Sequence, residues 1–127
     1  MSEAITRGIR VQVKSSYVEA RSAPLQGIYF FAYHVRIKNE GDVPVQLLSR
    51  RWTITDGIGR TEEVRGPGVV GAQPRLAPGE TFEYTSFCPL KTEIGSMNGT
   101  YQMQTAAGER FEAQIHPFTL ALPHALN

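Results

Sequence analysis

The sequence predicts an all-β protein, a β-sandwich of about seven strands. Three observations lead to this fold class. Apolar and polar residues alternate in short runs, as they do along strands with one buried face. The 12 Gly and 8 Pro lie between these runs, where they suit turns. No uninterrupted stretch has the spacing of an amphipathic helix, which favours two packed sheets over a mixed architecture.

The first two predicted strands span Ile9 to Val18 and Ile28 to Asn39. In both, every second residue is apolar over most of the run, which places one set of side chains in the core and the other in solvent. Asn39 to Asp42 consists of residue types that suit a turn, and a third run spans Val45 to Thr55. We therefore expect the second and third runs to pair as a hairpin.

The middle of the chain predicts two more strands. A short polar strand around Thr61 to Arg65 has the composition of a sheet edge. After a loop rich in Gly and Pro, Pro78 and Gly79 suit a type II turn that starts a strand over Phe82 to Cys88. Pro89 is expected to end that strand because proline has no backbone N–H.

Two further strands are predicted near the C-terminus. Gly99 to Thr105 forms one of them, and a last strand follows a short turn. The inward apolar residues of this last strand stand at odd positions up to Ile115 and at even positions from Phe118 onward. A bulge or bend near Pro117 is the simplest way to keep both sets in the core.

Arg50 conflicts with the alternation of the third run. It shares its parity with Leu48, Trp52 and Ile54, and we expect Trp52 to fill the core between the sheets. Either a bulge changes the phase at Arg50, or its guanidinium reaches out at the end of the sandwich while its stem packs inside. Because an inward arginine needs a carboxylate or carbonyl partner, a buried structural bridge and a ligand contact both stay open.

Length and composition bound the class of protein. The 127 residues, 14.1 kDa, fit a single domain over residues 1–127. The single cysteine, Cys88, cannot form an intrachain disulfide, and the first ten residues hold no apolar run, so we expect a cytoplasmic protein. No stretch approaches about 18 apolar residues, which excludes a membrane span. A net charge of +1 without a basic block argues against nucleic acid as a partner.

The most conspicuous chemical motif is GPGVVG at residues 66–71, which fits GxGxxG. In dinucleotide-binding folds such glycines let backbone N–H groups approach a pyrophosphate where a helix begins. Here Pro74 and Pro78 follow closely and no βαβ unit surrounds the loop, so glycines that permit a tight loop are the simpler interpretation.

The alternative for this loop is an anion-binding nest of backbone N–H groups. It would take a phosphate-bearing small molecule or a nucleotide. The candidate ligand residues are Gly66, Gly68, Gly71, Arg65, Arg75 and Arg50.

Residue types that serve metal binding or catalysis occur without a recognisable spacing. No two of the histidines and the cysteine stand at a short ligand spacing, so we expect surface histidines, a small buried cysteine, and neither a metal site nor a cofactor; these residues are His34, His116, His124 and Cys88. The neighbours Glu62 and Glu63 would point to opposite faces of a strand. No nucleophile has a local signature, and we expect no enzyme activity.

A resemblance to a known family is carried by four segments: FFAYHVRIKNEG, VQLLSRRWTITDGIG, VRGPGVVGAQPRLAPGETFEYTS and GSMNGTYQM. Together they resemble the ApaG family over roughly Arg10 to Phe118. The resemblance implies a sandwich of the immunoglobulin or fibronectin type III kind. It also implies genetic neighbourhood with a diadenosine tetraphosphate hydrolase, a link with cobalt resistance and magnesium efflux, and use of similar domains within eukaryotic F-box and polymerase-interacting proteins.

The leading hypothesis is a noncatalytic binding or adaptor module for a protein partner. It would use its edge strands or the loop Gly66 to Arg75 for this contact. The alternative is a phosphate- or nucleotide-binding protein that uses the GxGxxG loop. Homo-oligomers through a sheet edge also stay open, because the sequence does not show which edge is guarded.

Overall fold

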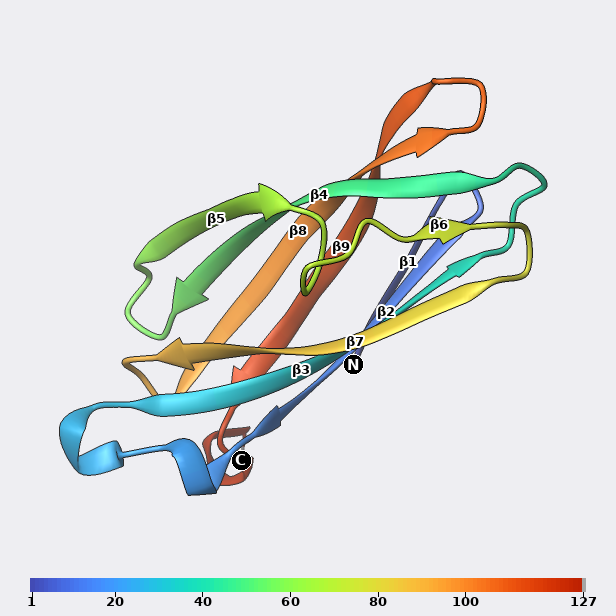
Figure 1. Cartoon of the computed structure of the whole chain (residues 1–127). Coiled ribbons are helices and arrows are strands. Elements are labelled where there is room, and N and C mark those ends of the chain that lie inside the picture. The colour runs from blue at the N-terminus through green and yellow to red at the C-terminus, as the bar shows by residue number, and fades with distance from the viewer. Residues whose placement is uncertain (127) are drawn as a thin grey trace.

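The computed structural model describes residues 1–126 and consists of two antiparallel sheets packed face to face (Figure 1). The first sheet has the order β1-β2-β3-β7, with β1 (Ser2–Thr6), β2 (Ile9–Tyr17), β3 (Tyr29–Asn39) and β7 (Thr81–Leu90). The second has the order β5-β4-β8-β9, with β6 also paired to β4; its strands are β4 (Val45–Asp56), β5 (Thr61–Pro67), β6 (Arg75–Leu76), β8 (Ile94–Thr105) and β9 (Arg110–Ala121).

The predicted all-β sandwich is confirmed, although residues 1–126 form nine strands where about seven were expected. The additional ones are β1 at the N-terminus and β6, which is only two residues long. Three short 3₁₀ helices complete the structure: η1 (Glu19–Arg21), η2 (Pro24–Gln26) and η3 (Pro123–Leu126). Within this described part of the chain, no helix is long and apolar enough to cross a membrane.

The predicted hairpin between the second and third runs is wrong. β3 pairs with β2 and β7, whereas β4 pairs with β5, β6 and β8, so the chain crosses from one sheet to the other between them. The buried side chain of Asn39 holds this crossing, since its amide donates to the carbonyls of Val43 (2.8 Å) and Leu76 (3.0 Å). Turn residues indicate where a chain reverses but not which strand receives it.

Two local predictions are confirmed. Gly79 has a positive φ of 88°, and the N–H of Glu80 closes the turn by donating to the carbonyl of Ala77 (2.9 Å). In the pairing of β8 with β9, Met97 lies opposite Phe118 and Gly99 opposite Ile115, so two residues of β9 face one of β8. This is the bulge expected near Pro117, and it keeps the apolar residues on both sides of it in the core.

The expected end of the strand at Pro89 is wrong, because β7 continues to Leu90 with Pro89 paired opposite Phe30. β7 is an edge strand of its sheet. A proline is tolerated there when its nitrogen faces away from the neighbouring strand, since no ladder hydrogen bond is then lost.

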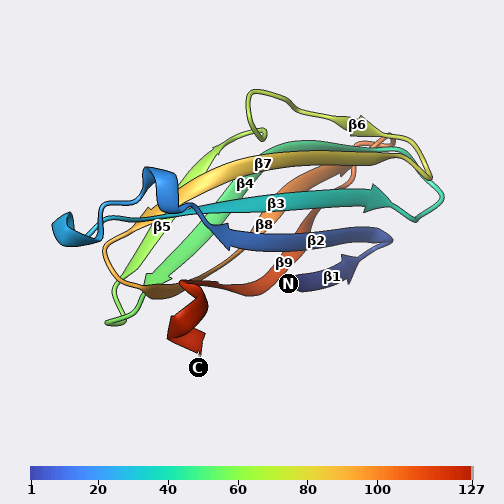
Figure 2. The same ribbon diagram turned by 90° about the horizontal axis from the view of Figure 1, so that it is seen from below.

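The two long sides of the sandwich differ. On one side β1 and β2 lie beside β9 (Figure 2). There the hydroxyl of Ser15 donates to the carbonyl of Thr119 (2.6 Å), and the N–H of Gln114 donates to Oγ1 of Thr6 (3.0 Å). We call this the closed side. On the other side, the edge strands β7 and β5 leave a cleft between them, and we call this the open side.

Candidate functional site

A cleft runs between the two sheets on the open side. The part beside the GxGxxG loop has a volume of about 360 Å³, and β3, β4, β7 and the loop contribute Tyr33, Arg50, Trp52, Val69, Tyr84 and Ser86. It continues into a part of about 290 Å³ that shares Arg50 and Trp52 and adds Ile54, Glu62, Val64, Phe87, Cys88 and Met97. We call the two parts together the Arg50 cleft.

Arg50 enters the cleft from β4. The pairing of β4 with β8 shifts its register between Leu47 and Ser49. As a result Leu47 is fully buried while Leu48 is not, and Arg50 stays on the inward face with Trp52. A bulge is therefore present, but it changes which leucine points inward and leaves Arg50 on the inward face. Arg50 adopts the second predicted arrangement, with its stem packed inside and its guanidinium at the opening of the cleft.

The guanidinium of Arg50 holds the GxGxxG loop. Its Nη1 donates to the carbonyls of Pro67 and Gly68, both at 3.0 Å. Gly66 lies opposite Arg50 in the β4–β5 ladder, and a Cβ at Gly66 would stand 2.9 Å from both Nη atoms. The structural bridge expected as one alternative thus exists. Nε and Nη2 have no acceptor among residues 1–126, so the ligand contact stays open as well.

The other glycines of the motif serve the shape of the loop. A Cβ at Gly68 would lie 2.2 Å from the carbonyl oxygen of Ala72. Val69 and Ala72 exchange two backbone hydrogen bonds (2.8 and 2.9 Å), which makes Val70 and Gly71 a two-residue turn with φ of 42° and 81°. These bonds occupy N–H groups that an anion would need, and binding of phosphate by this loop stays a prediction.

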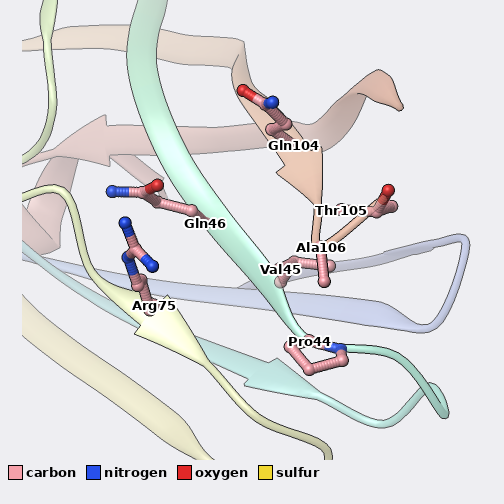
Figure 3. Close-up of a pocket in the computed structure, with 7 residues that line it drawn as sticks. All are labelled: Pro44, Val45, Gln46, Arg75, Gln104, Thr105 and Ala106. Atoms are coloured by element: carbon pink, nitrogen blue, oxygen red, sulfur yellow. The ribbon is translucent and has the colours of Figure 1, made fainter. Parts of the chain in front are cut away.

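The remaining two candidate arginines lie outside the cleft. Arg65 bonds to Glu63 on the exposed face of β5, and this bond lowers the pKa of the Glu63 carboxyl. Arg75 stands on β6, where its guanidinium lies beside the side-chain amide of Gln46 in a separate pocket (Figure 3). The structure thus brings Arg50 together with Gly66, Pro67 and Gly68, and Gly71 lines the same cleft. The side chains of Arg65 and Arg75 are not among those that line it.

Aromatic side chains form the floor of the cleft. Trp52 is 2% exposed, as the core position predicted for it requires, and meets Tyr33, Tyr101 and Phe118 edge to face at centroid distances of 5.3, 6.2 and 5.9 Å. Its buried Nε1–H has no acceptor within the described chain. The hydroxyls of Tyr84 and Tyr101 bond to each other, and burial raises the pKa of both phenols.

Sequence reasoning missed Tyr33, Tyr84 and Ser86 as cleft residues. The available signal was Ser86, a polar residue at an inward position between Tyr84 and Cys88. A hydroxyl at such a position indicates that the inner face there is not sealed from polar groups.

The histidines and the cysteine lie where the alternation placed them. His34 is exposed and contacts Thr85 through Nδ1 and Glu83 through Nε2, each at 2.9 Å. His116 is exposed, and Cys88 is buried, which raises the pKa of its thiol to about 11. Over residues 1–126, no three side chains of His, Cys, Asp or Glu gather as a metal site would require.

Two solved structures have the same architecture. The crystal structure of the putative ApaA protein from Bordetella pertussis superimposes with a TM-score of 0.89 and 56% identity, covering 91% of this chain and 94% of that one. The X-ray structure of a Northeast Structural Genomics Consortium target gives a TM-score of 0.86 and 46% identity, covering 91% and 88% of the two chains.

Sequence comparison finds relatives that are similar over almost the whole chain. Protein ApaG of Anaeromyxobacter sp. (strain K) is 57% identical over 127 residues, which cover 100% of both chains. Protein ApaG of Methylobacterium sp. (strain 4-46) is 57% identical over 124 residues, covering 98% of this chain and 95% of the relative. A family model described as the ApaG domain matches residues 19–105. The chain therefore belongs to the ApaG family.

Proposed function

We propose that this protein is a noncatalytic binding module that takes an extended segment of a partner protein into the Arg50 cleft. The observation that carries the proposal is the contrast between the two sides of the sandwich. β7 and β5 are sheet edges that flank a cleft, whereas β1, β2 and β9 are joined across the sheets. An edge strand presents unpaired N–H and C=O groups, and an added strand can pair with them.

The edge at β7 suits such a segment. It is ten residues long, more than a typical strand needs, and Pro89 near its end removes only one donor. Along it, side chains alternate between the cleft and the outer face. Phe87 lies on the outer face but also borders the cleft at its rim, where it is 47% exposed and packs on Phe30 at a centroid distance of 5.5 Å. A partner strand on this edge would reach both, and its alternate side chains would supply the specificity.

The inward nucleophile candidates support a noncatalytic role. Ser86 and Cys88 line the cleft, but His34 points to the outer face, where it contacts Glu83. A serine or cysteine nucleophile is activated by an adjacent base, and a thiol whose pKa is raised to about 11 is largely protonated at neutral pH. We place the module in the cytoplasm on its one buried thiol, and any link with cobalt resistance or magnesium efflux would then run through a partner.

Site-specific photocrosslinking in cells tests the proposal. A photoreactive residue at Phe87, on the rim of the cleft, should give a discrete protein adduct, and one at His116, exposed on β9, should not. The adduct should disappear with Ser86→Phe, which fills the cleft, and persist with Thr85→Phe, which adds the same ring to the exposed face of β7. Equal adducts from both positions, or an adduct insensitive to Ser86→Phe, would contradict binding in the cleft.

A further inference from the structure

We propose that the Arg50 cleft selects its partner segment by one carboxylate, the side chain of an aspartate or glutamate, which the guanidinium of Arg50 binds. The inference rests on the proposed function, because it names the chemistry that the same cleft recognises.

The first support is the state of Arg50 itself. The arginine ion pairs within residues 1–126 involve Arg7, Arg10, Arg51, Arg60 and Arg65, and Arg50 is not among them. Its partners are two carbonyls on Nη1, which leave the charge without a counterion and Nε and Nη2 without acceptors. A partly buried guanidinium in this state favours a carboxylate, whose two oxygens match its fork of donors.

The polar groups next to Arg50 are donors too. The buried Nε1–H of Trp52 has no acceptor among residues 1–126, and Tyr33 and Ser86, whose side chains hydrogen-bond to each other, contribute hydroxyls to the same cleft. Burial raises the pKa of Tyr33, so its phenol keeps its proton at neutral pH. The hydroxyl of Tyr84 is already bonded to that of Tyr101. A guanidinium and hydroxyl groups can all donate to a ligand that only accepts hydrogen bonds, as a carboxylate does.

The charge of the cleft favours a monoanion over a phosphate. Among the residues that line it, Arg50 is the cation, and Glu62 lines the part beside β5. The N–H groups of Gly68, Val69 and Ala72 already donate to backbone carbonyls, so the loop adds little to anion binding. A phosphate with about two negative charges would face one guanidinium and one carboxylate. A carboxylate ligand faces the same two groups with half that charge, so it is repelled less by Glu62.

The shape of the cleft favours a protein segment over a free acid. Arg50 lies where the two parts of the cleft meet, and the part beside β5 continues past it along Phe87 and Cys88. The edge of β7 borders both parts. A carboxylate at Arg50 can therefore belong to a residue whose backbone pairs with β7 and whose neighbours fill the part of the cleft beside β5.

Selection from a library of random linear peptides tests the inference, with the full chain as bait. Trp52 is the chain's one tryptophan and lines the cleft, so its fluorescence reports binding there. The selected peptides should share an acidic residue at one position. Exchange of that residue for its amide should raise the Kd about 10- to 100-fold, the effect of losing a charged hydrogen-bonded pair.

Protein variants assign the effect to Arg50. Arg50→Gln should raise the Kd for the acidic peptide by a similar factor. With this variant, the acidic peptide and its amide form should have nearly the same Kd. Arg51→Gln is the matched control, since Arg51 is exposed on the other face of β4 and pairs with Glu63; its Kd should stay within about twofold. The amide exchange in the peptide needs no change in the protein, so it tests the inference even if Arg50→Gln folds poorly.

Other outcomes separate this inference from the proposed function. Peptides that bind the cleft, as shown by their loss with Ser86→Phe, but carry no acidic preference would overturn the role of Arg50 and leave the peptide-binding function standing. Selection of no peptide sensitive to Ser86→Phe would overturn the proposed function itself. Binding of free glutarate as tightly as the acidic peptide would replace the protein segment by a small carboxylate.

Discussion

The closed and open sides of this sandwich are both formed by antiparallel strands, but they differ in the contacts made at the strand edges. On the closed side, Ser15 and Thr6 reach across to the backbone of β9. On the open side, Arg50 bonds to the carbonyls of the GxGxxG loop, and no strand within residues 1–126 pairs with the outer edge of β7. Side chains that join the two sheets stabilise the fold, while an edge that nothing covers is available to another chain.

The largest effect is expected from the aromatic side chains that pack beneath the cleft on the open side. Trp52→Ala should lower the free energy of unfolding by about 3–5 kcal/mol, because the indole packs on Tyr33, Tyr101 and Phe118. Urea denaturation measures the loss. Trp52→Phe, which keeps an aromatic ring, should lose clearly less. A loss below about 1 kcal/mol for Trp52→Ala would mean that this cluster does not hold the open side.

A pH dependence should follow from the tyrosines below the cleft. Burial raises the pKa of Tyr84 and Tyr101, so the folded chain keeps both phenols neutral while the unfolded chain ionises them near pH 10. Their stabilisation is complete below pH 10 and is lost as the pH rises above it, by about 1.4 kcal/mol per pH unit for each phenol. Denaturation at a series of alkaline pH values measures the slope.

The double variant Tyr84→Phe/Tyr101→Phe is the control for this slope. Both rings stay and both titrating groups are removed, so stability should decline much less steeply with pH. An equally steep decline would assign the effect to other groups.

Much of the closed side follows from the sequence, because alternation is a local property. The bulge at Pro117 was visible as a change of parity between Ile115 and Phe118, and the structure places it there. The pairing of β3 was not predictable in this way. Asn39 to Asp42 has turn residues, but the contact of Asn39 with Leu76, 37 positions away, directs the chain to the other sheet.

The open side was less predictable, because its features arise from contacts between distant segments. Arg50 was recognised as a conflict of parity, yet its carbonyl partners stand 17 and 18 positions away. Arg65 and Arg75 flank the loop in sequence, but one stands on an exposed strand face and the other on β6. Nearness in sequence therefore overestimated the basic character of the site.

A smaller effect should come from the tip of the GxGxxG loop. Val70 and Gly71 both have positive φ, and a Cβ at Gly71 would meet no neighbour within 4 Å. Gly71→Val should therefore lower the free energy of unfolding by about 1–2 kcal/mol through backbone conformation alone. Val70→Gly should relieve a comparable strain, offset in part by the flexibility of glycine in the unfolded chain. Thermal denaturation of the two variants compares these effects. If Gly71→Val stabilised the protein, a turn with positive φ at Gly71 would be contradicted.

The smallest effect is a comparison of single hydroxyls on the two sides. Ser15→Ala removes the hydrogen bond to the carbonyl of Thr119 and should lower the free energy of unfolding by about 1 kcal/mol. Ser86→Ala removes a hydroxyl from the wall of the open cleft together with its hydrogen bond to Tyr33. Because solvent in the cleft can replace that bond, we expect a loss of less than about 0.5 kcal/mol. Urea denaturation of the two variants side by side measures the difference. An equal loss at Ser86 would mean that the open side is held by polar contacts as the closed side is, and its cleft would then be a poorer receptor for another chain.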